Sequence, residues 1–345
     1  MPQLNGKSTK QLLRFVQKIV PPLLPSLHKG QGMPPTSPYP INPHVANFPP
    51  QLVELSYTGA PYFSAHAAAI FGADLTHVIC EYSAATVIKS YSPDLMVHPY
   101  MYDSSKLPSG ANEDTFLKEK VVPKIESLLG RIHVAIVGPG FGRDTLMLKT
   151  LETVIQMIKD KDMPLILDAD ALYLVSQKPK VIEGYEKAII TPNVVEFARI
   201  AKALGVNTDT DDDVGVTVEV SKKLGVTVMR KGEHDLIVSG DIVLTSDVNG
   251  SLRRVGGQGD TLTGIIATLV AWGINYGKLE PSKKDIDLSL GEILSLCCLG
   301  ASASTRYAAR KAFEDKGRAM QASDVHSKVG LAYKHLMEDE NLSHL

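Results

Sequence analysis

Short apolar runs alternate with longer amphipathic runs from residue 64 onward, and this order limits the chain to few folds. The strand-like runs cover residues 76–81, 133–137, 164–168 and 187–191, with helix-like segments between them. Apolar strands joined by helices are typical of a mostly parallel sheet covered on both faces. Runs at residues 226–230, 235–239 and 242–245 are separated only by turns, which indicates a hairpin edge. Long helical segments at about 260–274 and 292–313 complete the pattern. The sequence therefore predicts an α/β protein, a three-layer α/β/α sandwich with a mostly parallel central sheet.

Residues 1–29 are predicted to form an N-terminal docking helix and a linker. Ser8 is placed to cap a helix that runs to about Val20, and the prolines at 21 and 22 end it. This start is basic, and Glu54 is the first acidic residue of the chain. A basic, acid-free amphipathic start is also typical of a mitochondrial transit peptide. We expect a cytoplasmic protein with a docked helix, and a mitochondrial location is the alternative.

Residues 30–56 form an atypical proline-rich segment. Ten of the 21 prolines lie between positions 21 and 50. This composition predicts a surface loop or a disordered insert. Residues 57–340 are predicted to form a single catalytic domain.

The composition excludes several classes of protein. A formal net charge of −2 argues against a nucleic acid or a membrane surface as a partner held by bulk charge. Cys80, Cys297 and Cys298 have neither metal-ligand spacing nor the pattern of a disulfide framework. The longest apolar stretch, around residues 264–274, is too short to span a bilayer. These features favour an enzyme from a reducing compartment.

The segment RRVGGQGDTLTG, residues 253–264, carries the strongest chemical signal. Its three clustered glycines allow backbone amides to approach an anion, and the positive end of the following helix points to the same place. Asp260 stands at that end, and Thr261 and Thr263 add hydroxyl groups in the first turn. Amides that hold developing negative charge beside a proton-accepting carboxylate form a phosphoryl-transfer apparatus. The alternative is a helix start in which Asp260 is only a cap.

Four other motifs follow predicted strands, and each has a structural alternative. Residues 138–144, GPGFGRD, form either a tight turn or a loop against the phosphates of a ligand, with Arg143 nearby. Asp168 and Asp170 either hold a magnesium ion or cap a helix. In residues 191–197, TPNVVEF, Asn193 and Glu196 either form a capping box at the start of a helix or take part in the chemistry, and their spacing favours neither. Residues 231–235, KGEHD, form a hairpin turn that is also able to line a nucleotide.

Together these motifs resemble the ATP-dependent (S)-NAD(P)H-hydrate dehydratases of eukaryotes, a family with the ribokinase-like fold. The resemblance covers most of residues 57–313. Its motifs are YTGAPYFSA (57–65), VGPGFGRD (137–144), LDADAL (167–172), TPNVVEFARI (191–200), KGEHD (231–235) and RRVGGQGDTLTG (253–264). GGQGD in place of GGTGD is similar to the ATP-using eukaryotic branch. One departure stands out, because the family has a first hydrophobic strand where this chain has residues 30–55. Either this chain lacks that strand, or another segment substitutes for it.

The resemblance implies repair of NADH or NADPH hydrated at C6 of the nicotinamide ring, with ATP converted to ADP and phosphate. Asp260 would take the proton of the C6 hydroxyl, which attacks the γ-phosphate, and phosphate would then leave by elimination. Magnesium is expected through the phosphates of ATP, with no protein metal site. A separate epimerase and a homo-oligomer are the implied partners. The implied ligands of the hydrated dinucleotide are Gly140, Asn193, Val194, Val195, Glu196, Phe197, Ala198, Arg199 and Asp260. Those of ATP are Lys231, Gly232, Glu233, His234, Asp235, Asn249, Gly250, Ser251, Leu252, Arg253, Arg254, Val255, Gly256, Gly257, Gln258 and Gly259.

Two other functions stay open. A small-molecule kinase of the same fold, acting on an alcohol of the thiamine-precursor type, would use Asp260 in the same way but leave the phosphate on its product. An inactive, nucleotide-binding variant would follow if the altered N-terminal segment removes the first strand.

Overall fold

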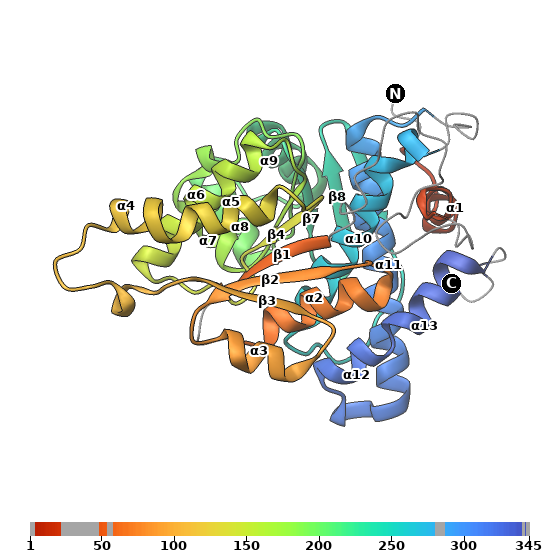
Figure 1. Cartoon of the computed structure of the whole chain (residues 1–345). Helices are drawn as coiled ribbons and strands as arrows, with labels where there is room; N and C mark the ends of the chain where they lie inside the picture. The colour runs from red at the N-terminus through yellow and green to blue at the C-terminus, as the bar shows by residue number, and fades with distance from the viewer. Residues whose placement is uncertain (1–3, 22–47, 54–57, 280–286, 340–341, 343–345) are drawn as a thin grey trace.

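The computed structural model describes residues 4–21, 48–53, 58–279, 287–339 and 342. Its strands form two groups. The first has the order β1 (Phe48–Val53), β2 (Thr76–Glu81) and β3 (Met96–Met101), with parallel pairing throughout. The second begins with the parallel strands β4 (Ala135–Val137), β5 (Leu165–Leu167), β6 (Ala188–Ile190) and β7 (Thr227–Arg230). β8 (Asp235–Ser239) and β9 (Ile242–Ser246) follow in antiparallel pairing, which confirms the predicted hairpin edge. β1 lies beside β4, so the two groups continue one another in one layer (Figure 1).

Helices cover both faces of this layer. One set comprises α2 (Gly59–Phe71), α10 (Gln258–Leu279) and α11 (Leu290–Lys316), and the other comprises α5 (Val122–Leu129), α6 (Thr145–Asp160), α7 (Asp170–Gln177), α8 (Val194–Ala203) and α9 (Asp213–Leu224). Alternate strand residues enter different cores, since Ile136 packs with the first set and Val137 with the second. This alternation confirms the predicted three-layer sandwich.

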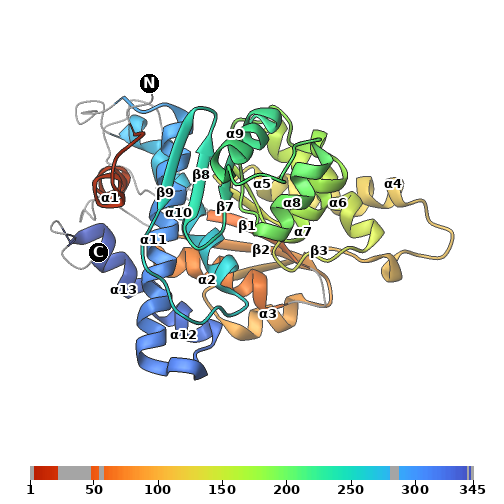
Figure 2. The same cartoon turned by 180° about the vertical axis from the view of Figure 1, so that it is seen from behind.

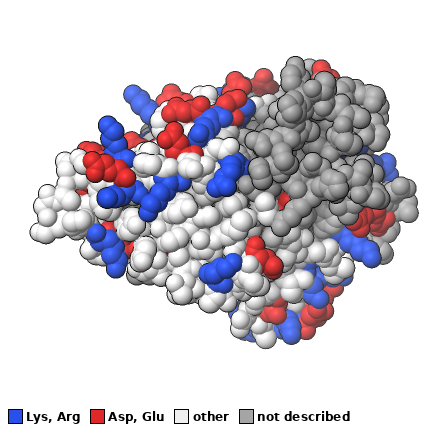
Figure 3. Space-filling view, in the orientation of Figure 1, with Lys and Arg blue, Asp and Glu red and all other residues white. Residues whose placement is uncertain are grey.

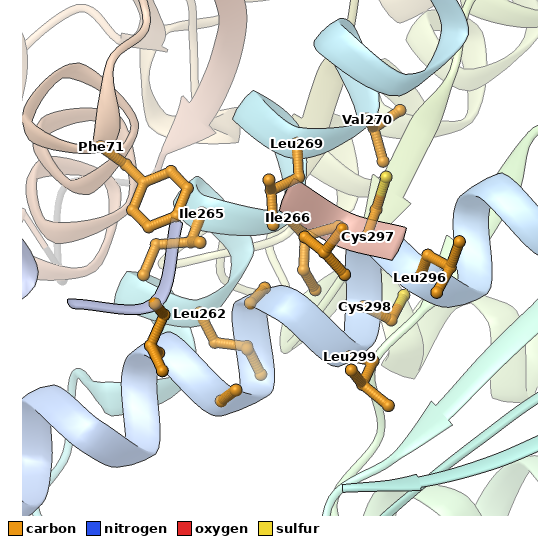
Figure 4. Close-up of a cluster of buried hydrophobic side chains, with 14 of the residues drawn as sticks. Phe71, Leu262, Ile265, Ile266, Leu269, Val270, Leu296, Cys297, Cys298 and Leu299 are labelled. Atoms are coloured by element: carbon orange, nitrogen blue, oxygen red, sulfur yellow. The ribbon is translucent and has the colours of Figure 1, made fainter. Parts of the chain in front are cut away.

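The core of the first set is apolar along the contact between α10 and α11. Figure 4 shows Ile266 and Val270 of α10 beside Cys297 of α11, and Phe71 of α2 beside Ile265 of α10. Cys80, Cys297 and Cys298 are all buried and free. Burial raises the pKa of the Cys297 and Cys298 thiols well above their usual range, so both are uncharged packing groups.

The N-terminal helix α1 (Thr9–Ile19) packs against α11. Ser8 caps it in a capping box with Gln11, and Leu12, Leu13 and Val16 are completely buried in the core. Figure 2 shows α1 on the same side of α11 as α13 (Val329–Tyr333), while α12 (Ala322–Ser327) packs near the end of α11. The docking helix is therefore present, while the linker from residue 22 to residue 29 lies outside the described residues. The boundaries at 29/30 and 56/57 stay predictions.

The sequence did not indicate β1 or β3, and both contain proline. β3 includes Pro99 and is the edge strand of its group, the place in a sheet where a missing N–H is tolerated. β1 includes Pro49 and Pro50, and its pairing with β2 is irregular between Phe48 and Pro50. Part of the proline-rich segment thus supplies a strand between β2 and β4, and residues 30–47 lie outside the described part.

Helix α3 (Ala85–Tyr91) packs against β3, and α4 (Glu113–Phe116) lies at the outer end of α5 (Figure 1). On the face seen in Figure 3, Lys and Arg side chains are interspersed with Asp and Glu among the described residues. None of the described helices has the length and apolar run needed to cross a membrane.

Candidate active site

Four predicted motifs meet at one edge of the sheet. β4, β5, β6 and β7 are parallel neighbours, and each runs directly into one of the motifs at residues 138–143, 168–170, 191–197 and 231–235. In an open α/β sheet this carboxyl edge is where ligands bind. The backbone joins two of these loops, because the Lys231 N–H donates to the Pro192 carbonyl at 2.9 Å.

A buried ion pair lies at the centre of this edge. The Asp168 side chain is 5% exposed and accepts a hydrogen bond from Lys231 Nζ at 2.8 Å. The burial of Lys231 opposes its charge, but Asp168, Glu196 and Asp260 outweigh this effect and raise the pKa of the lysine. The interpretation of Asp168 and Asp170 as helix caps is wrong, because neither side chain caps α7.

Asp260 lies in the first turn of α10, beside this ion pair. Its side chain is half-buried, and within the described part of the chain its carboxylate makes no hydrogen bond. Burial raises the pKa of Asp260 to about 7, the negative charge of Asp168 adds to the rise, and Lys231 opposes it. Asp260 is the third residue of α10 and not the residue before its first turn, so it does not occupy the N-cap position. A carboxylate with this pKa accepts a proton readily near neutral pH.

The glycine loop before Asp260 is held from two sides. Gly257 has φ +96°, and a Cβ there would lie 2.8 Å from Ala322 Cβ and 3.4 Å from Phe63 Cδ2, so this position requires glycine. The hydroxyl groups of Thr261 and Thr263 lie near the start of α10, where the sequence places them, but they bond to backbone carbonyl groups. Thr261 donates to the Gly257 carbonyl and Thr263 to the Asp260 carbonyl, and both side chains are completely buried. The helix end and the backbone amides remain as the anion-binding elements.

Arg306 of α11 anchors the predicted ATP turn at residues 231–235. Its Nη2 donates to Asp235 Oδ1 at 2.8 Å and to the Gly232 carbonyl at 3.0 Å, and its Nη1 donates to the Glu233 carbonyl at 2.7 Å. Asp235 also accepts from Ser302 Oγ at 2.7 Å and is 6% exposed. The predicted nucleotide ligand Asp235 is therefore a positioning residue for the turn. No sequence motif marks Arg306, which stands within the long helix α11.

The other predicted ATP residues, 249–259, follow β9 and approach the same turn. Arg306 Nη1 also donates to the Val248 carbonyl at 3.4 Å, and Arg254 Nη2 donates to the Gly232 carbonyl at 3.5 Å. Leu252 is 91% exposed, and Glu233 and His234 are exposed as well. The two predicted ATP segments therefore form one continuous surface.

The predicted dinucleotide segment forms the start of α8. Asn193 caps it, with a capping box to Glu196, which confirms the structural half of the interpretation. Val194 and Val195 are 57% and 58% exposed, and Ala198 and Arg199 are exposed too. Phe197 is 2% exposed and packs in the core beneath Arg230, so its side chain does not face a ligand.

The loop after β4 lies on the other side of Asp168. Gly138 has φ +112°, and a Cβ there would lie 1.9 Å from the Asp168 carbonyl oxygen. Asp170 Oδ2 accepts from the Gly142 N–H at 2.8 Å, and Asp170 Oδ1 lies 3.4 Å from Arg143 Nε. Gly140 is buried with φ +66°, whereas the Arg143 side chain is 55% exposed over the Tyr173 ring. The structure thus brings Arg143 rather than Gly140 to the surface of this loop.

The acidic groups at this edge lie around one lysine. Asp168, Glu196 and Asp260 surround the single ammonium of Lys231, so negative charge is in excess. Among the described residues no group of three or more His, Cys, Asp or Glu side chains is arranged to hold a metal ion. Magnesium commonly keeps few protein ligands and binds through substrate phosphates, and this edge fits that mode.

Solved structures with the same architecture define the class. A ribokinase-like superfamily protein from Enterococcus faecalis matches with a TM-score of 0.66 at 19% identity, over 94% of this chain and 95% of that one. An ADP/ATP-dependent NAD(P)H-hydrate dehydratase from Bacillus subtilis, co-crystallised with ATP/Mg²⁺, matches with a TM-score of 0.59 at 15% identity, over 94% and 97%. The chain therefore has the ribokinase-like fold.

Sequence comparison defines the family. The sequence pattern of the NAD(P)H-hydrate dehydratase family matches residues 54–330. An ATP-dependent (S)-NAD(P)H-hydrate dehydratase from Candida albicans is 43% identical over 97% of this chain and 98% of its own length. A protein of the same description from Homo sapiens is 39% identical over 96% of this chain and 86% of its own length. The chain belongs to the NAD(P)H-hydrate dehydratase family.

Proposed function

We propose that this chain dehydrates the S-epimer of hydrated NADH or NADPH to NADH or NADPH, and that it converts ATP to ADP and phosphate in doing so. The observation that carries the proposal is Asp260, a half-buried carboxylate without a hydrogen bond among the described residues, at the first turn of α10. Family membership at 43% identity to the Candida albicans protein supports the substrate and the use of ATP.

The residues suggest a reaction in two steps. Asp260 takes the proton of the C6 hydroxyl, whose oxygen then bonds to the γ-phosphorus as the bond to the ADP oxygen breaks. The C6–O bond then breaks as a proton leaves the ring, which restores the nicotinamide double bond and releases phosphate. Hydroxide is a poor leaving group and phosphate a better one, which explains why ATP is needed. The amides of the glycine loop and the N-terminus of α10 stabilise the charge that moves between the phosphates.

Magnesium, when bound, would neutralise charge on the transferring phosphate. We propose that the phosphate oxygens of ATP hold it. ATP itself would lie on the surface formed by residues 231–235 and 249–259, and the hydrated dinucleotide would lie across the start of α8 and the loop with Arg143.

The test of this function uses purified protein, S-NADHX, ATP and magnesium, followed at 340 nm with an ATP-omitted control. We expect an ATP-dependent rise in absorbance with equimolar phosphate. A phosphorylated product without a rise would favour the kinase alternative. Binding of ATP with no turnover would favour the inactive variant.

We predict that kcat/KM for the hydrated dinucleotide rises as the pH is raised through about 7, because the ionised form of Asp260 is the base. Burial of Asp260 raises its pKa, so the protonated form persists near neutral pH and the rising limb lies well above that of an ordinary aspartate. The measurement is the pH profile from pH 5 to pH 9 at saturating ATP. A flat profile between pH 6 and pH 8 would contradict the assignment.

We predict that Arg199→Ala weakens binding of the hydrated dinucleotide more than binding of ATP. Arg199 is exposed on α8, next to the predicted dinucleotide contacts, and carries a charge suited to a phosphate. Lys202→Ala, which removes another exposed cation from the same helix, is the matched control and should change neither. Titration calorimetry with each ligand measures both effects. Equal losses for the two ligands would remove Arg199 from the dinucleotide site.

A further inference from the structure

The Asp168–Lys231 ion pair lies directly against the turn that carries Asp260. A Cβ on Gly259, the residue before Asp260, would lie 3.4 Å from Asp168 Oδ2 and 3.5 Å from Lys231 Nζ. Asp168 follows β5 and Lys231 follows β7, so both come from rigid ends of the sheet. The ion pair therefore lies against the backbone that leads into Asp260, and the charge of Asp260 acts on Lys231.

Several carboxylates compete for this ammonium. Asp168, Glu196 and Asp260 all act on the charge of Lys231, yet the hydrogen bond goes to Asp168 at 2.8 Å. Glu196 is engaged by the Asn193 N–H at 2.8 Å. Among the described residues, the charges that act on Asp260 are those of Asp168 and Lys231. A direct ion pair between Lys231 and Asp260 would stabilise the ionised carboxylate and make it a weaker base.

The turn at residues 168–170 directs its two carboxylates to opposite sides. Ala169 has φ 51° and ψ −119°, a backbone conformation that costs energy for a residue with a Cβ. On one side the Asp168 carboxylate accepts a hydrogen bond from Lys231. On the other side the Asp170 carboxylate accepts one from the Gly142 N–H and forms an ion pair with Arg143. The turn thus fixes the Asp168 carboxylate in the place where it holds the lysine.

We propose that Asp168 is a positioning residue that holds Lys231 in an ion pair and thereby keeps this lysine from pairing with Asp260, which stays available as a base. The part about catalysis rests on the proposed function, but the arrangement of charges does not. The test therefore measures the titration of Asp260 in the free protein, where its outcome is independent of whether S-NADHX is the substrate.

The experiment follows the carboxyl carbons by NMR in protein labelled with ¹³C at aspartate Cγ, with Asp260→Asn to assign the Asp260 signal. We expect Asp260 in the wild type to titrate at about 7. Asp168→Asn removes the like charge and frees the lysine, so it should lower this pKa by about one to three pH units. Lys231→Met in the Asp168→Asn background should raise it again. Lys231→Met alone should raise the pKa of Asp260 above its wild-type value.

The matched control is Asp170→Asn, which removes a charge from the same turn on its other side and should leave the Asp260 titration unchanged. If Asp168→Asn does not fold, Lys231→Met alone carries the test. A double variant with the same low pKa as Asp168→Asn would overturn the proposal, as would a folded Asp168→Asn variant that titrates like the wild type. In active protein, the pH at which kcat/KM rises should change in the same order from variant to variant.

Discussion

Replacement of Asp260 by asparagine is expected to lower turnover by about a hundred- to ten-thousand-fold, the usual contribution of a general base. The amide has almost the same shape as the carboxylate but does not accept the proton of the C6 hydroxyl. ATP binding should persist, because the predicted ATP surface comprises the glycine loop and residues 231–235 rather than this carboxylate. The measurement is kcat at saturating ligands, with ATP affinity measured by calorimetry on the same sample.

The stability of this variant provides an internal control. The pKa of Asp260 is raised in the folded state, so the folded protein binds that proton more tightly than the unfolded chain. The stability contribution of this proton is present at low pH and is lost as the pH rises through about 7. Asp260→Asn should therefore be at least as stable as the wild type at pH 8. A variant that keeps wild-type turnover would remove Asp260 from the role of base.

Arg306→Ala is expected to cost about 3–5 kcal/mol of folding free energy, because it removes one partner of a buried ion pair. The two side chains are only 17% and 9% exposed, and the substitution leaves Asp235 charged and without its cation. The turn at residues 231–235 would also lose the donors to its carbonyl groups, so the KM for ATP should rise. Denaturant unfolding and steady-state kinetics measure the two effects.

The control for this prediction is Lys311→Ala, on the same helix. Lys311 pairs with Glu314, and their side chains are 34% and 49% exposed, so this ion pair should contribute no more than about 1 kcal/mol. Arg306→Lys retains the positive charge but not the paired donors. Its loss of folding free energy should therefore lie between those of Arg306→Ala and Lys311→Ala. Equal losses for Arg306→Ala and Lys311→Ala would show that the buried pair does not anchor the turn.

The parallel part of the fold was predictable because its strands are apolar on both faces. β2 matches the predicted range at residues 76–81, and β4, β5 and β6 lie within theirs. β1 and β3 were not predictable, because Pro49, Pro50 and Pro99 oppose strand formation in a local pattern. Strand pairing with β2 outweighs that local preference in both cases.

The candidate site was predictable where a residue type stands directly after a strand or a glycine loop. Lys231 and Asn193 follow strands, and Asp260 follows the glycine loop. Spacing alone did not show that Asp168 forms an ion pair with Lys231, because 63 residues separate the two in the chain. Arg306 lies 71 residues from Asp235 on a helix that looks purely structural in sequence. Partners at such separations are defined by the packing of the sheet and its helices.

The most direct test of the central claim follows the oxygen atom on C6 of the hydrated dinucleotide. S-NADHX labelled with ¹⁸O in its C6 hydroxyl is converted with ATP and magnesium, and the released phosphate is analysed by mass spectrometry. If Asp260 activates that hydroxyl to attack the γ-phosphate, one ¹⁸O atom enters each phosphate released with NADH. Unlabelled phosphate, with the ¹⁸O found in water, would contradict phosphorylation followed by elimination at this site.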